Sequence, residues 1–271
     1  MTRNRNRPNW HYPTAIAVAA FAWMLLMTGH EVVGHGGACV GLGGEALAVD
    51  AMYFTCSELT PLWNDQLYRA AGSLFNVLLA IGCVIAFLRL PRPGSWTGYF
   101  LWISAVLNLL QSGSYVALGR FIHPGMDWAM IAANAPDAAV AGTLTLVCGL
   151  GLLAAGVLVG QRFLGLFIAR GARVHRQKIR LVLTPYLTAT FVSVAASLGV
   201  PSEDRFMMLM GGIGNSLFFL APILLLLVLP VRGQGLVESE PDFAPRRGLV
   251  VAATATTLVY LFVIASGVEL G

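Results

Sequence analysis

The chain has 271 residues, of which 57% are hydrophobic and only 11% charged, and its mean hydropathy is +0.73. This composition excludes an ordinary soluble domain and indicates an all-α, polytopic helical membrane protein, with residues 1–271 forming a single membrane domain. The net charge of +4 does not call for a nucleic-acid partner, because the basic residues follow a topology pattern instead.

Seven segments are long and apolar enough to span a bilayer. In chain order we place them at about 13–34, 66–88, 97–118, 137–160, 181–199, 206–230 and 248–268. Residues 1–12 are basic, but the apolar run after them is too long for a signal peptide and no small-residue cleavage site follows. We therefore expect the first segment to be retained as a span.

The basic residues predict the orientation. With the N-terminus inside, 14 of the 17 Lys and Arg fall in the cytoplasmic pieces 1–12, 89–96, 161–180 and 231–247. The positive-inside rule therefore predicts seven spans with the N-terminus inside and the C-terminus outside, in a membrane taken to be a bacterial inner (plasma) membrane. The basic stretch 162–180 is interpreted as a loop or surface helix on anionic membrane lipid.

The first span ends in His30-Glu31-Val32-Val33-Gly34-His35, near the predicted extracytoplasmic face. Ionisable side chains at membrane depth are costly, and they indicate a functional site by default. The pattern is one residue longer than H-E-x-x-H, the helical zinc motif in which two His bind metal and Glu is the general base.

The extra residue has a geometrical consequence. Positions four apart on an α-helix differ by about 40° around the axis, whereas positions five apart differ by about 140°. His30 and His35 can therefore share a metal only if the helix widens or ends between them. A π-bulge would place them on one face, and Gly34, Gly36 and Gly37 make this part of the helix deformable.

The connection 119–136 supplies further candidate ligands at the same predicted depth. Asp127 is chosen as the third ligand, because catalytic zinc sites commonly combine two His with one carboxylate; a helix N-cap is its alternative role. His123 either ligates or supports the site, and Pro124-Gly125 disfavours a regular helix between it and Asp127.

The loop 43–65 is the longest on the predicted outer side. Its Ala46–Phe54 stretch alternates weakly and is interpreted as a short hairpin or a re-entrant piece. Cys39 and Cys56 both fall on this side, where a disulfide is chemically allowed, although the spacing alone does not establish the pairing.

Three stretches resemble the site-2 protease family of intramembrane zinc metalloproteases, especially its short, divergent bacterial-type members. Residues 30–37 resemble the family's H-E-x-G-H helix with one insertion, and residues 71–76 (Ala-Gly-Ser-Leu-Phe-Asn) resemble its A-G-P-x-x-N element. Asn108, followed by Asp127-Trp128, is similar to the later segment with an Asn and an Asp. Residues 13–135 would form the metalloprotease-like core and 136–271 additional transmembrane helices.

The resemblance implies one zinc ion held by His30, His35 and Asp127. It further implies that Glu31 activates a water on that metal and that Asn76 or Asn108 helps to place the oxyanion or the substrate, a transmembrane or juxtamembrane peptide. Four features depart from the family pattern. They are the His spacing of five, Ser73 in place of Pro, the lack of Pro after Asn108 and of Gly after Asp127, and a site on the extracytoplasmic rather than the cytosolic side.

Two other classes of function are compatible with the sequence. One is a non-proteolytic membrane metalloenzyme that uses the same ligands on a lipidic or small substrate. Its His-rich di-iron form is disfavoured, because the chain has only five histidines. The other is a transporter or receptor, in which Gly211, Gly212 and Gly214 would mark a broken helix, although a close helix contact is the preferred interpretation of these glycines.

Overall fold

The computed structural model describes residues 10–169, 173–200, 205–231 and 241–270. These residues include seven helices that are long and apolar enough to cross a membrane, so the predicted all-α, polytopic membrane fold is confirmed. The helices are Tyr12–Gly41, Leu62–Leu88, Trp96–Ile122, Ala138–Phe167, Val174–Gly199, Leu209–Val228 and Arg247–Ile264. The orientation stays a prediction. Some of the basic residues behind it lie outside the described residues, namely Arg3, Arg5, Arg7, Arg170 and Arg232.

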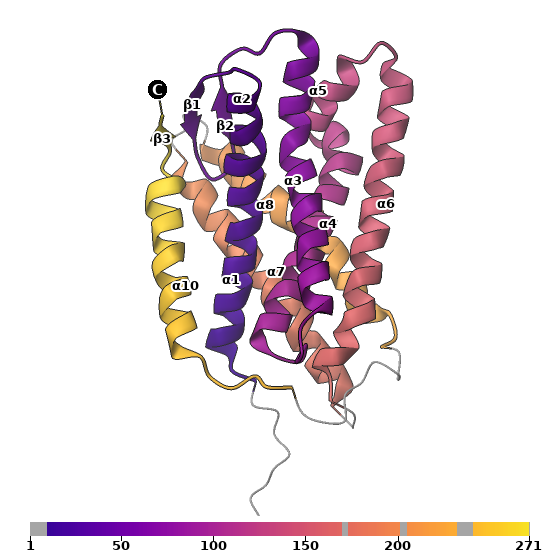
Figure 1. Cartoon of the computed structure of the whole chain (residues 1–271), viewed down its shortest axis with the longest axis vertical. Coiled ribbons are helices and arrows are strands. Elements are labelled where there is room, and N and C mark those ends of the chain that lie inside the picture. Colours follow the sequence, from indigo (N-terminus) through magenta and orange to yellow (C-terminus); the bar gives the residue numbers. More distant parts are fainter. Residues whose placement is uncertain (1–9, 170–172, 201–204, 232–240, 271) are drawn as a thin grey trace, which may run out of the picture.

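Figure 1 shows these helices standing side by side as a bundle, with a small sheet at one end. The first span comprises α1 (Tyr12–Thr28), the π-helix η1 (Gly29–Gly36) and α2 (Gly37–Gly41). The remaining elements, in chain order, are β1 (Ala46–Val49), β2 (Phe54–Cys56), α3 (Leu62–Leu88), α4 (Trp96–Ile122), α5 (Asp127–Ala133), α6 (Ala138–Leu164), η2 (Gly165–Phe167), α7 (Val174–Gly199), α8 (Arg205–Leu220), η3 (Ala221–Leu224), α9 (Leu225–Val228), α10 (Arg247–Val259), η5 (Tyr260–Ile264) and β3 (Val268–Glu269).

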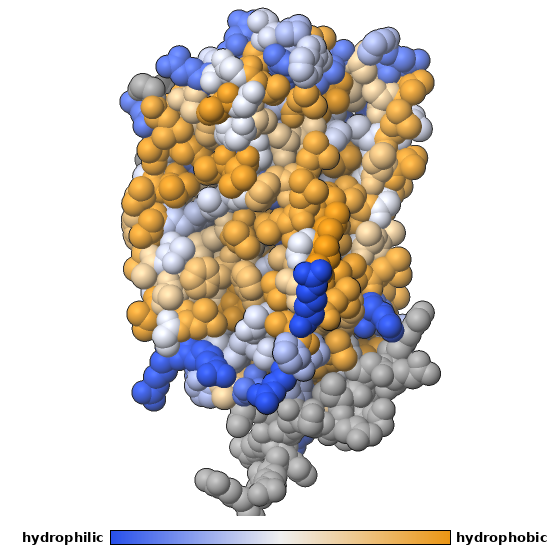
Figure 2. Space-filling view, viewed as in Figure 1, coloured by the Kyte–Doolittle hydropathy of each residue, from blue (hydrophilic) through white to orange (hydrophobic). Residues whose placement is uncertain are grey.

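The surface matches a membrane setting. Figure 2 shows a broad hydrophobic belt around the middle of the visible face and hydrophilic residues at both ends. Large apolar side chains are exposed along the spans, among them Leu78, Leu158 and Phe191. Lipid tails can cover such side chains. The backbone of a helix can also face lipid, because its polar groups are hydrogen-bonded within the helix.

The central helix of the bundle is α4, which packs against α1, α3, α6 and α8. Trp102 and Leu107 are among its fully buried side chains. Glycines bring it close to α6: a Cβ added at Gly113 would lie 2.6 Å from the backbone nitrogen of Leu153. Small residues at such crossings let helices of membrane proteins pack closely, and the packing fixes the rotation of α4 in the bundle.

The fifth span begins earlier than expected. α7 starts at Val174 rather than near 181 and continues through Pro185. Residues 174–180 therefore belong to the spanning helix and not to a separate loop or surface helix. Lys178 is buried there, and its Nζ donates a hydrogen bond to the backbone oxygen of Leu229. This partner and a long aliphatic stem accommodate a cation within a helix of this kind.

α8 continues without interruption through the glycines at 211, 212 and 214. A Cβ added at Gly212 would lie 2.4 Å from Oγ of Ser197 on α7. Gly212 thus allows α8 to pack closely on α7 and does not mark a broken helix.

A three-stranded antiparallel sheet lies at the His30 end of the bundle (Figure 1). β1 and β2 form a hairpin, which confirms that interpretation of the loop. Its turn is shaped by Asp50, whose Oδ1 accepts hydrogen bonds from the backbone N–H groups of Met52 and Tyr53. β3, which follows the seventh span, pairs with the other edge of β1 and was not anticipated.

A disulfide joins Cys39 in α2 to Cys56 in β2, with the two Cα atoms 5.9 Å apart. The sequence had left this pairing open. The bond anchors the hairpin to the end of the first span, directly after the two histidines.

Candidate metal centre

The first span widens at the histidines. Residues Gly29–Gly36 form a π-helix, so of the two expected possibilities, a helix that widens or one that ends between His30 and His35, the structure has the first. The i→i+5 bonding of a π-helix brings positions five apart to one face. The two imidazole centroids are 4.9 Å apart, with their planes at 75°. The wider turn thus compensates for the extra residue between the two histidines.

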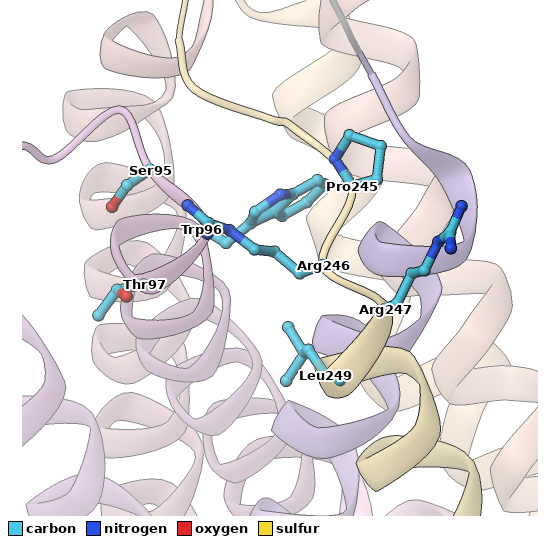
Figure 3. Close-up of a pocket in the computed structure, with 8 residues that line it drawn as sticks. Ser95, Trp96, Thr97, Pro245, Arg246, Arg247 and Leu249 are labelled. Atoms are coloured by element: carbon cyan, nitrogen blue, oxygen red, sulfur yellow. The ribbon is translucent and has the colours of Figure 1, made fainter.

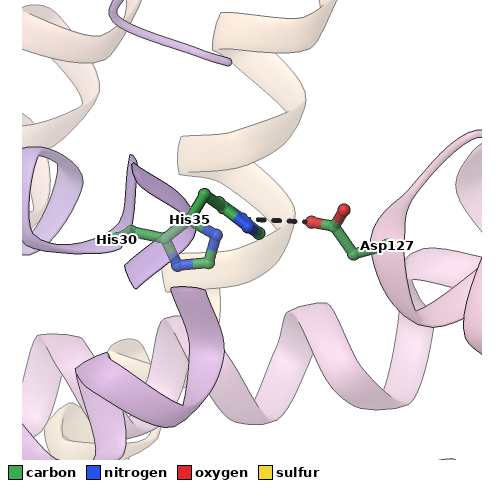
Figure 4. A group of neighbouring side chains, drawn as sticks. All are labelled: His30, His35 and Asp127. Carbon is green, nitrogen blue, oxygen red and sulfur yellow. Dashed lines mark ion pairs between the residues drawn. The ribbon is translucent and has the colours of Figure 1, made fainter. Parts of the chain in front are cut away.

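Asp127 completes a group of three possible ligands. One ligand atom from each of His30, His35 and Asp127 lies within 4.8 Å of the other two, which makes the group a possible metal site. Figure 4 shows the two imidazoles on one segment and the carboxylate reaching them from a separate helix, α5. The Nε2 of His35 is 3.5 Å from Oδ2 of Asp127. Ligands about 2.0–2.1 Å from a tetrahedral zinc lie roughly 3.3 Å apart, so this spacing fits.

Gly72 on α3 leaves room in front of both imidazoles. A Cβ added there would lie 2.6 Å from Nε2 of His30 and 2.6 Å from Nε2 of His35. The same two nitrogens therefore face one space that only a residue without a side chain leaves free. At Gly34 an added Cβ would lie 2.5 Å from the Cα of Gly72, so η1 and α3 are in backbone contact here. The donor set and this space fit a metal ion.

Neighbouring groups orient the ligands. His35 Nδ1 donates to the backbone oxygen of Tyr68 at 2.8 Å, which leaves Nε2 to face Asp127. The hydroxyl of Tyr115 donates to Oδ2 of Asp127 at 2.9 Å, and Arg69 Nη1 lies 3.8 Å from its Oδ1. Metal-binding histidines usually donate their second ring N–H to a carbonyl or carboxylate in this manner.

The electrostatics favour an ionised Asp127. Burial raises the pKa of its carboxyl, but hydrogen bonds with His35 and Tyr115 and the charge of the imidazoles lower that pKa, and the net pKa is below its usual value. An ionised carboxylate suits either a metal ion or a protonated His35. The same geometry suits both partners of the carboxylate, and a measurement of bound metal tells them apart.

Glu31 is buried beside this group, with 7% of its surface exposed. Its carboxylate lies next to the backbone of Phe54 in β2 and is not one of the three clustered ligand atoms. A base, unlike a ligand, has to be near the metal without occupying it.

The other predicted site residues have different positions. Asn76 lies against the metal group, with its Nδ2 3.1 Å from Nδ1 of His30. Asn108 is buried further along α4, where its Nδ2 donates to the backbone oxygen of Ser104. His123 is exposed; its Nδ1 accepts from the backbone N–H of Gly125, and it is not brought together with the three ligands.

No motif in the sequence marks the residues that hold Asp127 in place. Asp127 is the first residue of α5, so its carboxylate is free to face the histidines instead of capping the helix at the Ncap position. Next to it, Trp128 Nε1 donates to Oγ of Ser73 at 2.9 Å. The hydroxyl of Ser73 thus docks α5 on α3. The one feature of the sequence that could have indicated Tyr115 is its position on the polar face of α4.

A separate cavity of about 500 Å³ lies at the other end of the bundle. Figure 3 shows it between the starts of α4 and α10, lined by residues including Trp96, Arg246 and Arg247. The backbone N–H of Arg246 bonds Thr14 near the start of α1, which is about 24 Å along the helix from His30. This cavity is therefore not part of the metal group.

No protein-family model, curated protein or solved structure matches the chain.

Proposed function

We propose that this chain is a membrane-embedded, metal-dependent hydrolase, most closely akin to zinc intramembrane proteases of the site-2 protease type. The observation that carries the proposal is the π-helical turn that brings His30 and His35 together with Asp127. Two imidazoles and one carboxylate are the protein ligands of many catalytic zinc sites, which keep a fourth position for water or substrate. The buried Glu31 beside them is the candidate base.

The chemistry divides between the metal and the chain. A bound zinc would polarise the scissile carbonyl and lower the pKa of water toward neutrality. Glu31 would take the proton of the attacking water and pass it to the leaving amine. Tyr115 and Arg69 would hold the Asp127 carboxylate in position, while the backbone oxygen of Tyr68 would hold His35.

Two features support an extracytoplasmic position for the site. The disulfide between Cys39 and Cys56 lies at the His30 end, and disulfides persist in oxidising compartments. Independently, nine of the twelve Lys and Arg within the described residues fall in the predicted cytoplasmic pieces, whose described parts lie at the opposite end of the bundle. We propose on this basis that the metal group opens toward the outer face of a bacterial plasma membrane, where it meets a transmembrane or juxtamembrane peptide.

Metal analysis of the purified protein tests the proposal. Wild type should carry about one zinc per chain, and His30→Ala, His35→Ala and Asp127→Ala should each lose it, because each removes one ligand. His123→Ala is the matched control: this exposed histidine should be dispensable for metal binding. Wild type without any transition metal would overturn the proposal, and iron or copper in place of zinc would favour a non-proteolytic metalloenzyme.

Hydrolysis is tested separately with transmembrane peptides reconstituted beside the protein in lipid vesicles containing H₂¹⁸O. Mass spectrometry should find new carboxyl termini that carry ¹⁸O. Glu31→Gln should retain the metal and lose this cleavage, because the amide cannot accept the proton of the water. Equal cleavage by Glu31→Gln and wild type would reject Glu31 as the base.

A further inference from the structure

Asn76 and Gln111 form a buried chain of amides that ends on His30. Asn76 Nδ2 is 3.1 Å from Nδ1 of His30 and 3.3 Å from Oε1 of Gln111. Asn76 is fully buried and Gln111 is 3% exposed. Among the described residues, Oδ1 of Asn76 has no hydrogen-bond partner. No hydrogen bond at Oδ1 therefore opposes a rotation of this amide.

The position of the metal group sets a requirement on His30. Its Nε2 faces the space in front of Gly72, next to Nε2 of His35. An imidazole that binds a metal through Nε2 carries its hydrogen on Nδ1, and this N–H needs an acceptor. For His35 the backbone oxygen of Tyr68 is that acceptor. The only side chain within hydrogen-bond distance of Nδ1 of His30, among the described residues, is Asn76.

An amide side chain can meet the requirement by turning. Rotation by 180° about its last bond exchanges the oxygen and nitrogen of an asparagine with little change in shape. Oδ1 of Asn76 would then accept from Nδ1 of His30. The same rotation of Gln111 would turn its Nε2 toward that oxygen, so that a donor would again face an acceptor at both contacts.

We propose that Asn76 and Gln111 are positioning residues for His30: their amides turn together when metal binds, so that Gln111 donates to Asn76 and Asn76 accepts the Nδ1 proton of His30. This inference rests on the metal site of the proposed function. It gives Asn76 a role different from the substrate-placing one that the family resemblance implies. It also adds Gln111, which no motif contains.

The distinction between accepting and donating makes the proposal testable. Aspartate has nearly the shape of asparagine but, when ionised, only accepts hydrogen bonds. Asn76→Asp should therefore keep or strengthen Zn²⁺ binding, whereas Asn76→Leu, which has no acceptor, should weaken it by about tenfold to a hundredfold. Gln111→Leu should weaken binding less than Asn76→Leu, since it leaves the direct acceptor of His30 in place.

Binding is measured on the full-length protein in detergent, by competition of Zn²⁺ with a chromophoric chelator and by the visible absorption of the Co²⁺-loaded protein. The Co²⁺ bands should shift in Asn76→Leu, because they depend on the orientation of the imidazole. Asn215→Asp and Asn215→Leu are the controls. Asn215 is a buried asparagine of α8 whose Nδ2 faces Sδ of Met27, and neither change should alter the affinity or the bands.

The outcomes separate this inference from the proposed function. Wild type that binds neither Zn²⁺ nor Co²⁺ overturns both. Wild type that binds metal, with Asn76→Leu unchanged in affinity and spectrum, overturns only the positioning role. Weakening by Asn76→Asp as large as that by Asn76→Leu, with the variant folded by its thermal unfolding curve, would show that Asn76 donates to His30 and would also overturn it. If Asn76→Asp does not fold, the Asn76→Leu and Gln111→Leu affinities decide.

Discussion

Within the described residues two stretches are π-helical, η1 and η5, and they lie at the same end of the bundle but serve different purposes. η1 is glycine-rich and mostly buried, and its two imidazoles face Gly72 of α3. η5 reads Tyr-Leu-Phe-Val-Ile, and most of its side chains are exposed or half-exposed. Its single buried residue, Tyr260, directs its hydroxyl to the backbone oxygen of Ala51 at the turn of the hairpin.

The difference shows what a π turn contributes. In both stretches the wider turn changes which side chains share a face. In η5 the one buried side chain, Tyr260, contacts the hairpin, and this contact is structural. In η1 the wider turn aligns two imidazoles, and a metal group arises only because α3 and α5 supply the open space and the third ligand. The backbone geometry is shared, and the neighbours decide the chemistry.

The largest effect should come from filling the open space opposite η1. Gly72→Ala places a Cβ 2.6 Å from both Nε2 atoms, so we expect loss of stoichiometric zinc and a destabilisation of about 1–3 kcal/mol from overpacking. Zinc content and thermal unfolding check this. Gly82→Ala, on the same helix with open space around it, should retain zinc. Full zinc content in Gly72→Ala would place the ion elsewhere.

A smaller effect should follow from loosening the third ligand. Tyr115→Phe removes the hydroxyl that donates to Asp127, and we expect zinc affinity to fall by about tenfold to a hundredfold without loss of the fold. Chelator competition measures the affinity. Tyr186→Phe, at a buried tyrosine of α7, is the control and should bind zinc as wild type does. An unchanged affinity in Tyr115→Phe would mean that Arg69 and α5 hold Asp127 unaided.

Removing the inserted residue should change zinc affinity by less than about tenfold. Deletion of Val33 leaves the histidines four positions apart, and a regular α-helix then places them within about 40° of each other. The π turn would no longer be needed, and the ligands would still converge. Zinc titration and helix content by circular dichroism measure the outcome. Abolished binding in a folded deletion variant would show that the wide turn itself shapes the site.

The smallest effect should appear at η5. Tyr260→Phe removes the hydrogen bond to Ala51, and we expect a loss of about 0.5–1.5 kcal/mol in unfolding free energy with zinc affinity unchanged. Thermal unfolding and chelator competition measure the two quantities on the same sample. A fall in zinc affinity here would contradict the contrast between the two π-helices, because it would couple the hairpin turn to the metal group.

Much of the fold follows from local signals. Long apolar runs predicted all seven spans, and the five-residue His spacing among glycines predicted that the helix would either widen or end there; the structure has the wider, π-helical turn. Both signals lie within one segment, where periodicity and backbone freedom act. Asp127 was chosen as the third ligand from general ligand chemistry, and His123 was kept as a further candidate ligand; the structure brings only Asp127 to the histidines.

The features that could not be predicted from the sequence are those that depend on contacts between helices. Nothing near Tyr115 or Gln111 in the sequence shows which neighbour each side chain meets, because helix rotation is fixed by packing such as that of Gly113 on α6. The Tyr68 contact uses a backbone oxygen, which carries no residue signature. β3 is two residues long, and its partner lies before the second span, so neither pattern nor proximity revealed it.

The pairing of β1 with β3 has a consequence for biogenesis. All three proposed metal ligands have been synthesised once Asp127 is made, but the strand that completes the sheet beside them follows the seventh span. At about 5–20 residues per second, ribosomes need roughly 7–28 s to reach Val268 from there. During that interval the nascent chain already has its ligands while one edge of β1 still awaits its partner.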